Sequence, residues 1–325
     1  MRVLIALGGN AMIGPGGDAS TQSQQAAIAL ACERLADLIA SGHDVVLTHG
    51  NGPQVGNLLV KNEMAAAEVP PVPLDWCVAQ TQATIGFTIQ NALASALLAR
   101  GISRETATLV TRTVVDDQDA AFSRPTKPVG RYLPRERAQQ LIDHGQHWED
   151  RGDRGWRRVV SSPAPLEVLD VATMSALVAS GHIVIAAGGG GIPVVREPDG
   201  SLRGVEAVID KDLTATLLAR SLAVDILLIA TDVDHVMIGF GTPKARALQR
   251  VTADELRGHA QAGQFASGSM GPKVEAALGF VDGGGQRAVI TSLDRISDGI
   301  TGSFGTVVEA SSPDADNNKE GLIGV

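Results

Sequence analysis

Short apolar segments that alternate with helical patterns constrain the fold of this chain more than any other feature. The segments 2–7, 45–48 and 182–187 are apolar along almost their whole length, as expected of strands buried on both faces of a sheet. Between them lie stretches with helical apolar spacing, such as 20–40 and 77–100. This alternation predicts an α/β fold with a mostly parallel sheet covered by helices on both sides.

The same pattern continues to about residue 310, with one interruption. Residues 116–165 contain five prolines, two of the three tryptophans and a dense run of charges at 149–154. We predict that this segment, called here the protruding subdomain, projects from the sheet. The residues 311–325 are expected to form a disordered tail. Further strands are predicted at 106–111, 225–230, 287–291 and 305–309, helices at 171–180, 212–222, 252–261 and 272–282, and a hairpin at 199–200.

Charge and cysteine content disfavour several classes of protein. The net charge of -9 argues against a nucleic-acid binder, which needs a basic surface to neutralise phosphates. Cys32 and Cys77 form neither a CxxC pair nor a metal-ligand pattern, so we expect reduced thiols, a cytoplasmic location and no dedicated metal site. No stretch approaches the ~20 apolar residues of a membrane helix, and residues 3–7 are too short for the core of a signal peptide.

Glycine-rich loops follow three of the predicted strands. Such loops let backbone N–H groups approach an anion, although each is also compatible with a tight turn. Because ligands bind at the carboxyl ends of strands in open α/β sheets, the repetition favours an anion site. The loops match neither GxGxxG nor GxxxxGK[ST], so Rossmann and P-loop sites are not supported. The residues expected to contact the anion are Gly8, Gly9, Asn10, Gly50, Asn51, Gly52, Gly189 and Gly190.

Lysine is scarce, and its few positions are informative. Only six of the 27 basic residues are lysine, so arginine fills most basic positions. Lys127 lies in a proline-stiffened loop, Lys211 lies between two aspartates at a helix start, and Lys273 follows a proline suited to a first helical turn. Surface charge or helix capping could explain any one of them. A compact ammonium group serves a point-charge role that arginine does not, and the three together favour function.

Two further side chains have alternative explanations. Asp212 either orients the lysines or only stabilises the N-terminus of its helix through the helix dipole. His49, after the second strand, is either a catalytic base or a hydrogen-bonded structural residue, and the second explanation is favoured.

Glycine loops and mobile ammonium groups suit one reaction class in particular. Phosphoryl transfer requires positioning and charge neutralisation more than covalent chemistry. GxSxG, HExxH and CxxC motifs are absent from the sequence, so hydrolase, zincin and redox functions are disfavoured.

These motifs, in this order, resemble the carbamate kinases of the amino acid kinase superfamily. The resemblance spans essentially residues 1–310 and rests on long unbroken motifs. They are Ala6-Leu7-Gly8-Gly9-Asn10-Ala11, His49-Gly50-Asn51-Gly52-Pro53-Gln54-Val55-Gly56-Asn57, Pro125-Thr126-Lys127-Pro128, 188–193, 204–212, Thr231-Asp232-Val233 and 268–273.

The resemblance implies both a fold and a reaction. The fold is an open, mainly parallel eight-stranded sheet in an αβα sandwich, with one kinase domain over 1–310 that assembles as a homodimer. The N-terminal part would bind carbamate or carbamoyl phosphate, and the part from about residue 180 would bind ATP or ADP with Mg²⁺. The reaction is ATP + carbamate = ADP + carbamoyl phosphate, run toward ATP synthesis in arginine and carbamoyl phosphate catabolism. The implied catalytic residues are Lys127, Lys211, Asp212 and Lys273, and the implied nucleotide contacts are Thr231, Asp232, Phe240, Ser269, Met270 and Lys273.

The sequence departs from the family pattern at two places. Ala6 stands where many superfamily members carry a lysine, and the resemblance implies that Lys127 supplies the missing charge. Gly239 stands at an expected asparagine, while Phe240 keeps an aromatic, so base preference is less constrained than the chemistry. Two rival functions are a kinase of another small carboxylate or carbamoyl-like acid and a non-catalytic sensor of nucleotide or acyl phosphate. Retention of the three lysines and Asp212 argues against the sensor.

Overall fold

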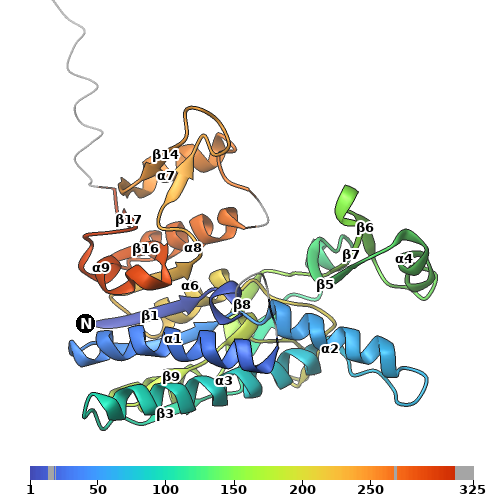
Figure 1. Ribbon diagram of the computed structural model, residues 1–325, viewed down its shortest axis with the longest axis horizontal. Helices are drawn as coiled ribbons and strands as arrows, with labels where there is room; N and C mark the ends of the chain where they lie inside the picture. The colour runs from blue at the N-terminus through green and yellow to red at the C-terminus, as the bar shows by residue number, and fades with distance from the viewer. Residues whose placement is uncertain (14–17, 19, 267–268, 312–325) are drawn as a thin grey trace, which may run out of the picture.

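One eight-stranded sheet organises the molecule (Figure 1). The computed structural model describes residues 1–13, 18, 20–266 and 269–311. The strand order is β15-β17-β16-β12-β1-β2-β9-β3, and all neighbouring pairs are parallel except β16 with β17. The predicted fold class is confirmed. The strands are β1 (Arg2–Leu7), β2 (Asp44–His49), β3 (Thr106–Thr108), β9 (Ile183–Ile185), β12 (Ile226–Thr231), β15 (Arg250–Thr252), β16 (Arg287–Ser292) and β17 (Thr306–Glu309).

Helices cover both faces of this sheet. Along β1, Val3 and Ile5 enter one apolar core while Leu4 and Ala6 enter the other, and all four are inaccessible to water. Burial on both faces explains why β1 is continuously apolar. The first core is closed by α1 (Thr21–Ala40), α3 (Leu74–Ala99) and α9 (Ile296–Thr301), and the second by α5 (Val171–Ala179), α6 (Lys211–Ser221), α7 (Ala253–Gln261) and α8 (Met270–Asp282).

Local capping sets several helix boundaries close to those predicted. Helix α1 begins after Ser20, whose hydroxyl oxygen accepts the N–H of Ser23. Helix α7 begins with a capping box between Thr252 and Glu255. Helix α2 (Gly52–Ala65) is not among the predicted elements, although Pro53 in its first turn is a recognised start signal.

The predicted strand 106–111 is wrong in its second half. The chain leaves the main sheet after Thr108 and enters a second sheet at β4 (Arg112–Val115). At the crossing, the side-chain amide of Gln82 donates to the carbonyl oxygen of Thr111 at 3.1 Å, and its oxygen accepts the Thr111 N–H at 2.8 Å. The side chain of Gln82 on α3 thus holds this backbone where the chain passes between the two sheets, and the N–H of Ile192 also donates to the Thr111 carbonyl oxygen.

The second sheet has the order β11-β10-β4-β8 and carries the protruding subdomain. Strands β4 and β8 (Pro165–Val168) are antiparallel, and Val115 pairs with Pro165, so the subdomain leaves and returns at neighbouring points. Strands β10 (Ile192–Arg196) and β11 (Leu202–Gly204) form the hairpin predicted at 199–200.

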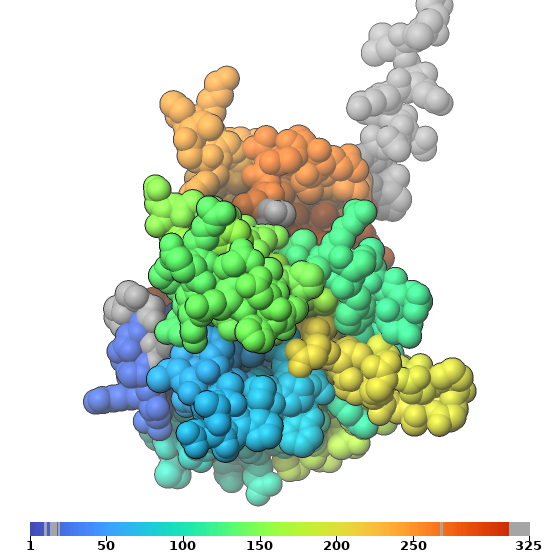
Figure 2. Space-filling view, turned by 90° about the vertical axis from the view of Figure 1, so that its right-hand side faces the viewer, coloured from blue at the N-terminus to red at the C-terminus, as the bar shows by residue number. Residues whose placement is uncertain are grey.

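The protruding subdomain has a three-stranded sheet and a core of its own. Leu133, Ala138 and Trp148 are buried together. In Figure 2 the subdomain (green) faces the viewer between α2 (blue, below) and the C-terminal elements (orange, above). Its main elements are β5 (Lys127–Leu133), α4 (Arg135–Ile142), β6 (Trp148–Asp150) and β7 (Trp156–Val160).

The remaining described elements are short. A two-stranded sheet of β13 (Val236–Ile238) and β14 (Arg246–Leu248) stands apart from the main sheet. Across the described ranges, no helix combines the length and apolarity needed to cross a membrane. Of the predicted tail, all but Ser311 lies outside the described residues. The short 3₁₀ helices are η1 (Gly9–Met12), η3 (Ala120–Phe122), η4 (Gly152–Arg154), η5 (Gly188–Gly190) and η6 (Leu293–Arg295).

The loop before β10 generates a stability prediction. Gly191 has φ +92°, and a Cβ atom there would lie 2.0 Å from Oγ1 of Thr113. Gly200 has φ +86° with no atom near such a Cβ. Gly200→Ala should therefore cost only backbone strain, about 1 kcal/mol, whereas Gly191→Ala adds overpacking of about 1–3 kcal/mol. Chemical denaturation of both variants measures this difference, and equal losses of unfolding free energy would contradict it.

Candidate active site

A cavity of about 360 Å³ opens where the strands of the main sheet end at their carboxyl termini. It is reached by the segments that follow β1, β2, β9 and β12, which is the position expected of a ligand site in an open α/β sheet. The lining residues are Gly8, Gly9, Gly50, Asn51, Gly52, Pro53, Val55, Lys127, Pro128, Val129, Gly189, Val208, Ile209, Asp210, Lys211, Asp212, Thr231, Asp232, Ser269, Pro272 and Lys273.

Glycine lets the first two loops come into backbone contact at the cavity floor. A Cβ atom on Gly50 would lie 2.8 Å from the backbone nitrogen of Gly9, and one on Gly8 would lie 3.0 Å from the carbonyl oxygen of Ala230. Any side chain at these positions would push the strand ends apart. The loops therefore present bare backbone to the cavity.

Three helix N-termini converge on the cavity. Helix α2 contributes Asn51 and Gly52, α6 contributes Lys211, and α8 contributes Ser269 and Lys273. Each N-terminus carries partial positive charge and free N–H groups. Together they make the cavity an attractive place for phosphate oxygens.

Asp212 holds two lysines in one buried cluster. Its Oδ1 lies 2.5 Å from Nζ of Lys211 and its Oδ2 lies 2.9 Å from Nζ of Lys273. The three side chains are 5%, 13% and 14% exposed, in the order Asp212, Lys211, Lys273. Burial alone would raise the pKa of Asp212, but the two ammonium groups outweigh it and hold that pKa at about 2.

Burial acts on Lys211 in the opposite sense. It lowers the pKa of the Lys211 ammonium, because the charged form loses its hydration, and the nearby charge of Lys273 lowers that pKa further. The carboxylate of Asp212 opposes both effects. Asp212 thus makes the contacts that its predicted role in orienting the lysines requires.

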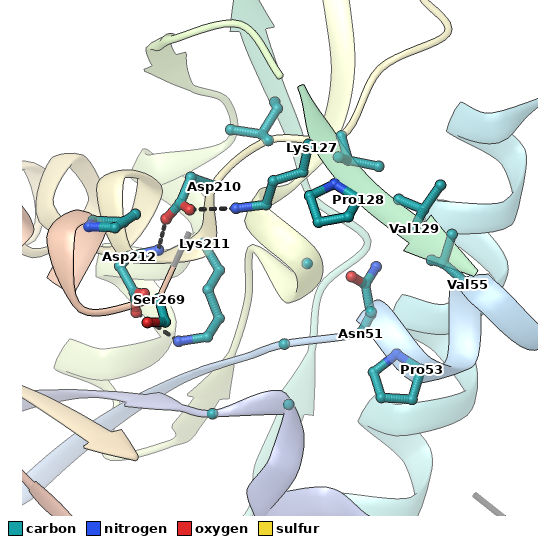
Figure 3. Close-up of a pocket in the computed structure, with 18 of the residues that line it drawn as sticks. Asn51, Pro53, Val55, Lys127, Pro128, Val129, Asp210, Lys211, Asp212 and Ser269 are labelled. Carbon is teal, nitrogen blue, oxygen red and sulfur yellow. Dashed lines mark hydrogen bonds and ion pairs between the residues drawn. The ribbon is translucent and has the colours of Figure 1, made fainter. Parts of the chain in front are cut away.

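Lys127 reaches the cavity from the protruding subdomain (Figure 3). Its Nζ lies 2.7 Å from Oδ2 of Asp210, in the loop before α6. Opposite, Asn51 and Pro53 enter the cavity from the start of α2. The structure therefore brings the three predicted lysines to one cavity, although they are separated by up to 146 residues in the sequence.

The amide of Asn51 is held from behind the cavity wall. Its Nδ2 donates to the hydroxyl oxygen of Thr81 at 3.0 Å, and Thr81 in turn donates to the carbonyl oxygen of Val78. Gly189, with φ +67°, passes so close that a Cβ atom there would overlap this amide. These contacts fix the orientation of Asn51, one of the residues predicted to contact the acid.

His49 is structural, as the favoured interpretation held. The ring is 1% exposed, its Nδ1 lies 2.9 Å from the carbonyl oxygen of Gly50, and it does not line the cavity. A Cβ atom on Gly188 would lie 2.4 Å from the ring, so the histidine fills the space that this glycine leaves.

Several predicted contacts are not at the cavity surface. Gly190 packs against the backbone of Ile209, Met270 packs against the core below α8, and Phe240 is 80% exposed on the loop between β13 and β14. The side chain of Asn10 lies outside the described part of the chain. The predicted ligand contacts of these residues stay predictions, whereas Thr231, Asp232 and Ser269 do line the cavity.

Sequence reasoning missed the role of Asp210. In the sequence, Asp210 is only the neighbour of Lys211 at a helix start. In the structure, its carboxylate links Lys127 of the protruding subdomain to α6. Its position before a helix start was a signal for capping, but its second partner is 83 residues away in the sequence.

Among the described residues, no group of three or more acidic, histidine or cysteine side chains could hold a metal ion by itself. Both oxygens of Asp212 are taken by lysines. Asp232 lines the cavity and is paired with no lysine or arginine there, and its Oδ1 accepts the hydroxyl of Thr231 at 3.1 Å. The side chains fit a cation that arrives with phosphates better than a resident one.

Comparison with known proteins agrees with this geometry. Residues 1–292 match the model of the amino acid kinase family. The chain therefore belongs to the amino acid kinase family, whose fold and charge-lined cavity are those of a phosphotransferase.

Three relatives show which members of this family the chain resembles. The carbamate kinase of Thermococcus kodakarensis is 46% identical over 94% of this chain and 98% of the relative. Carbamate kinase 1 of Enterococcus faecium is 44% identical over 91% of this chain and 94% of the relative. The structure of carbamate kinase from Giardia lamblia bound to AMP-PNP is 39% identical, covers 95% of this chain and 98% of its own, and superposes with a TM-score of 0.90. Within the amino acid kinase family, the chain therefore belongs to the carbamate kinases, and the resemblance predicted from the sequence is confirmed.

Burial of His49 generates a prediction about acid stability. Burial, together with the charge of Lys211, lowers its pKa from 6.5 to about 4, so the unfolded chain takes up this proton first. The stability that depends on neutral His49 is present above pH 6.5 and is lost as the pH falls to 4, by up to about 3 kcal/mol.

His49→Gln replaces the imidazole with a neutral amide that can still form hydrogen bonds, and so removes the titration. The unfolding free energy of the wild type should fall more steeply than that of the variant between pH 7 and pH 4. His144→Gln, which removes an exposed imidazole of the protruding subdomain, controls for histidine content. Parallel curves for wild type and His49→Gln would contradict the prediction.

Proposed function

We propose that the protein transfers a phosphoryl group reversibly between carbamoyl phosphate and ADP, forming carbamate and ATP, in the cavity described above. The observation that carries the proposal is the pair of lysines held on one buried aspartate where three helix N-termini and two glycine loops meet. Phosphoryl transfer concentrates negative charge on the equatorial oxygens of the moving group. This cavity supplies fixed positive charge and N–H donors without a covalent nucleophile.

The two substrates would occupy opposite ends of the cavity. Gly8, Gly9, Gly50 and Asn51 offer backbone and amide donors to the carbamate end. Thr231, Asp232, Ser269 and Lys273 lie at the end formed by the C-terminal part of the chain. The Giardia lamblia relative was solved with AMP-PNP, an adenine nucleotide, which supports assigning a nucleotide to this chain.

The lysines divide the work by position. Lys211 and Lys273 would neutralise the transferring group and the nucleotide phosphates, with Asp212 holding both in place. Lys127 would reach the bridging region from the protruding subdomain and take the place of the lysine that Ala6 lacks. In the direction of ATP formation, the bond between phosphorus and the carbamate oxygen breaks, and a terminal phosphate oxygen of ADP forms the new bond.

Mg²⁺ belongs to the proposal as a companion of the nucleotide. It would be held mainly by phosphate oxygens, with Asp232 the cavity-lining carboxylate left free of a basic partner among the described residues. When bound, it would neutralise nucleotide charge.

The physiological direction we propose is ATP synthesis during arginine or carbamoyl phosphate catabolism, in the cytoplasm. Two buried free thiols, Cys32 and Cys77, are compatible with a reducing compartment. A second candidate is a kinase of another small carboxylate or carbamoyl-like acid. The chain is 44% identical to the carbamate kinase-like protein YqeA of Escherichia coli, over 94% of this chain and 98% of that protein, and that name does not specify the acid.

A coupled assay separates the two candidates. Carbamoyl phosphate should support ATP formation from ADP with higher kcat/KM than acetyl phosphate or other acyl phosphates. A higher value for another acyl phosphate would favour the second candidate.

A homodimer is the assembly we propose, with the outer face of α3 as its contact. Trp76, Phe87 and Leu98 are 61%, 51% and 78% exposed, and their spacing of 11 residues, about three turns, places them on one side of the helix. Asp75 is the only charged residue in this 26-residue helix. Figure 1 shows α3 at the lower edge of the molecule. A long, uncharged, partly apolar helix face suits contact with a second copy of itself.

The lysine cluster yields a kinetic prediction. Lys211→Ala and Lys273→Ala should each lower kcat for ATP synthesis by ~10²–10³, because each removes a donor to developing charge. Lys127→Ala should lower kcat strongly with a smaller effect on ADP affinity, and arginine should replace it poorly. Lys61→Ala, on α2 outside the cavity, is the matched control. Near-wild-type turnover in any folded cavity variant would remove that lysine from the catalytic set.

The α3 face yields a prediction about assembly. Phe87→Arg would bring two equal charges together across a two-fold contact and should raise the dimer dissociation constant at least ~tenfold. Sedimentation over a concentration series measures this shift. Leu166→Arg alters an equally exposed apolar residue on β8 and should leave the dimer intact. A monomeric wild type, or an unchanged Phe87→Arg dimer, would contradict the proposal.

A further inference from the structure

Asp210 makes two separate contacts with its two carboxylate oxygens. Oδ1 accepts the backbone N–H of Asp212 at 2.9 Å and so caps α6. Oδ2 accepts from Nζ of Lys127 at 2.7 Å. Helix α6, which Asp210 caps, packs against the main sheet. Lys127, in contrast, is the first residue of β5 in the protruding subdomain.

The Asp210 end of this link is rigidly held. The hydroxyl of Thr214 donates to the carbonyl oxygen of Gly190, and the N–H of Thr214 donates to the carbonyl oxygen of Asp210. Gly190 lies so close to Ile209 that a Cβ atom on it would meet the Ile209 carbonyl oxygen at 2.7 Å. The Asp210 carboxylate is only 13% exposed, so it has little freedom to follow a moving partner.

The Lys127 end of this link is more exposed to water than the Asp210 end. Lys127 is 34% exposed and lies at the cavity edge, where water can compete for its ammonium group. Apolar side chains of the subdomain also pack nearby, because Val129 and Val160 are buried in one cluster with Val55 of α2. The N–H of Val208 donates to the carbonyl oxygen of Ser161 at 3.0 Å. Within the described residues, Lys127 with Asp210 is the one ion pair between the subdomain and the loop that leads into α6.

Charge also requires a partner for Lys127. Three ammonium groups face the cavity, and Asp212 is already shared by Lys211 and Lys273. Without Asp210, Lys127 would face two like charges with no carboxylate of its own, and repulsion would favour its withdrawal.

We propose that Asp210 is a positioning residue that holds Lys127, and with it the start of β5, over the cavity before substrate binds. The proposal rests on the proposed function in that Lys127 acts on the transferring group. When the anionic phosphoryl donor arrives, it can share Lys127 with Asp210 without a large movement of the subdomain. Asp210 touches no reacting atom and acts through Lys127.

Asp210→Asn separates this role from helix capping. Asparagine caps helices as well as aspartate, so its oxygen can still accept the Asp212 N–H, but the ion pair to Lys127 is lost. We expect kcat for ATP synthesis to fall about ten- to a hundredfold, as expected for a misplaced catalytic group, with KM for ADP within about twofold of wild type. Asp199→Asn makes the same change at an exposed hairpin and is the matched control.

A double-mutant cycle with Lys127→Ala tests whether Asp210 acts through Lys127. In the Lys127→Ala background, Asp210→Asn should change kcat by less than about threefold. Independent, multiplying effects, or an Asp210→Asn variant with wild-type kcat, would overturn the proposal. If Asp210 served only as a helix cap, Asp210→Asn would keep both the kcat and the melting temperature near those of the wild type, because asparagine preserves the cap.

Hydrogen exchange gives a readout that does not depend on turnover. In the ligand-free protein, the amides of β5 should exchange faster in Asp210→Asn than in wild type or Asp199→Asn, and the double variant should match Lys127→Ala. If the wild type does not use carbamoyl phosphate, the proposed function fails, yet this exchange pattern still supports the positioning role. Unchanged exchange in β5 overturns it in either case.

Discussion

The site places several ammonium groups in one cavity, and the structure around it depends on how their mutual repulsion is offset. Asp212 is buried and ionised because Lys211 and Lys273 hold its pKa at about 2. The lysines in turn tolerate burial because the same carboxylate lies within 3 Å of both. Removing the carboxylate would leave two buried cations repelling each other, which is far costlier than losing a single surface pair. The site is therefore a unit in which no member is independent of the others.

The sheet brings this unit together. Strands β1, β2, β9 and β12 are neighbours or near neighbours and parallel, so their following loops open on the same edge. Glycines at positions 8, 50 and 189 let these loops approach within backbone contact of each other or of Asn51. The loops owe their tight packing to the absence of side chains, and the same absence exposes N–H groups to a ligand. Structural and binding explanations of these glycines are thus not alternatives.

The sequence was sufficient for what depends on local pattern and on residue type. Apolar runs located nearly all strands of the main sheet, and the scarcity of lysine pointed to Lys127, Lys211 and Lys273. Long-range hydrogen bonds were beyond its reach. The strand predicted at 106–111 is wrong in its second half because Gln82, 29 residues earlier on a helix, forms hydrogen bonds with both backbone groups of Thr111. Asp210 was overlooked for a similar reason, since a capping aspartate looks ordinary until its second oxygen is found on Lys127. Helix α2 was missed because its glycine-rich start resembles a loop, although Pro53 was visible.

The attachment of the protruding subdomain has a consequence for how such enzymes diversify. Its two connections enter and leave at β4 and β8, where Val115 and Pro165 are paired neighbours. The 49 residues between them are therefore an enlarged hairpin loop. Its base is closed by the second sheet, which is separate from the eight-stranded sheet. Lengthening, shortening or replacing such a loop leaves the register of the eight-stranded sheet untouched. The protruding subdomain, which supplies Lys127, could thus be replaced as a unit during evolution. A new acid substrate could then be selected while the nucleotide end of the cavity and its buried charges remained unaltered.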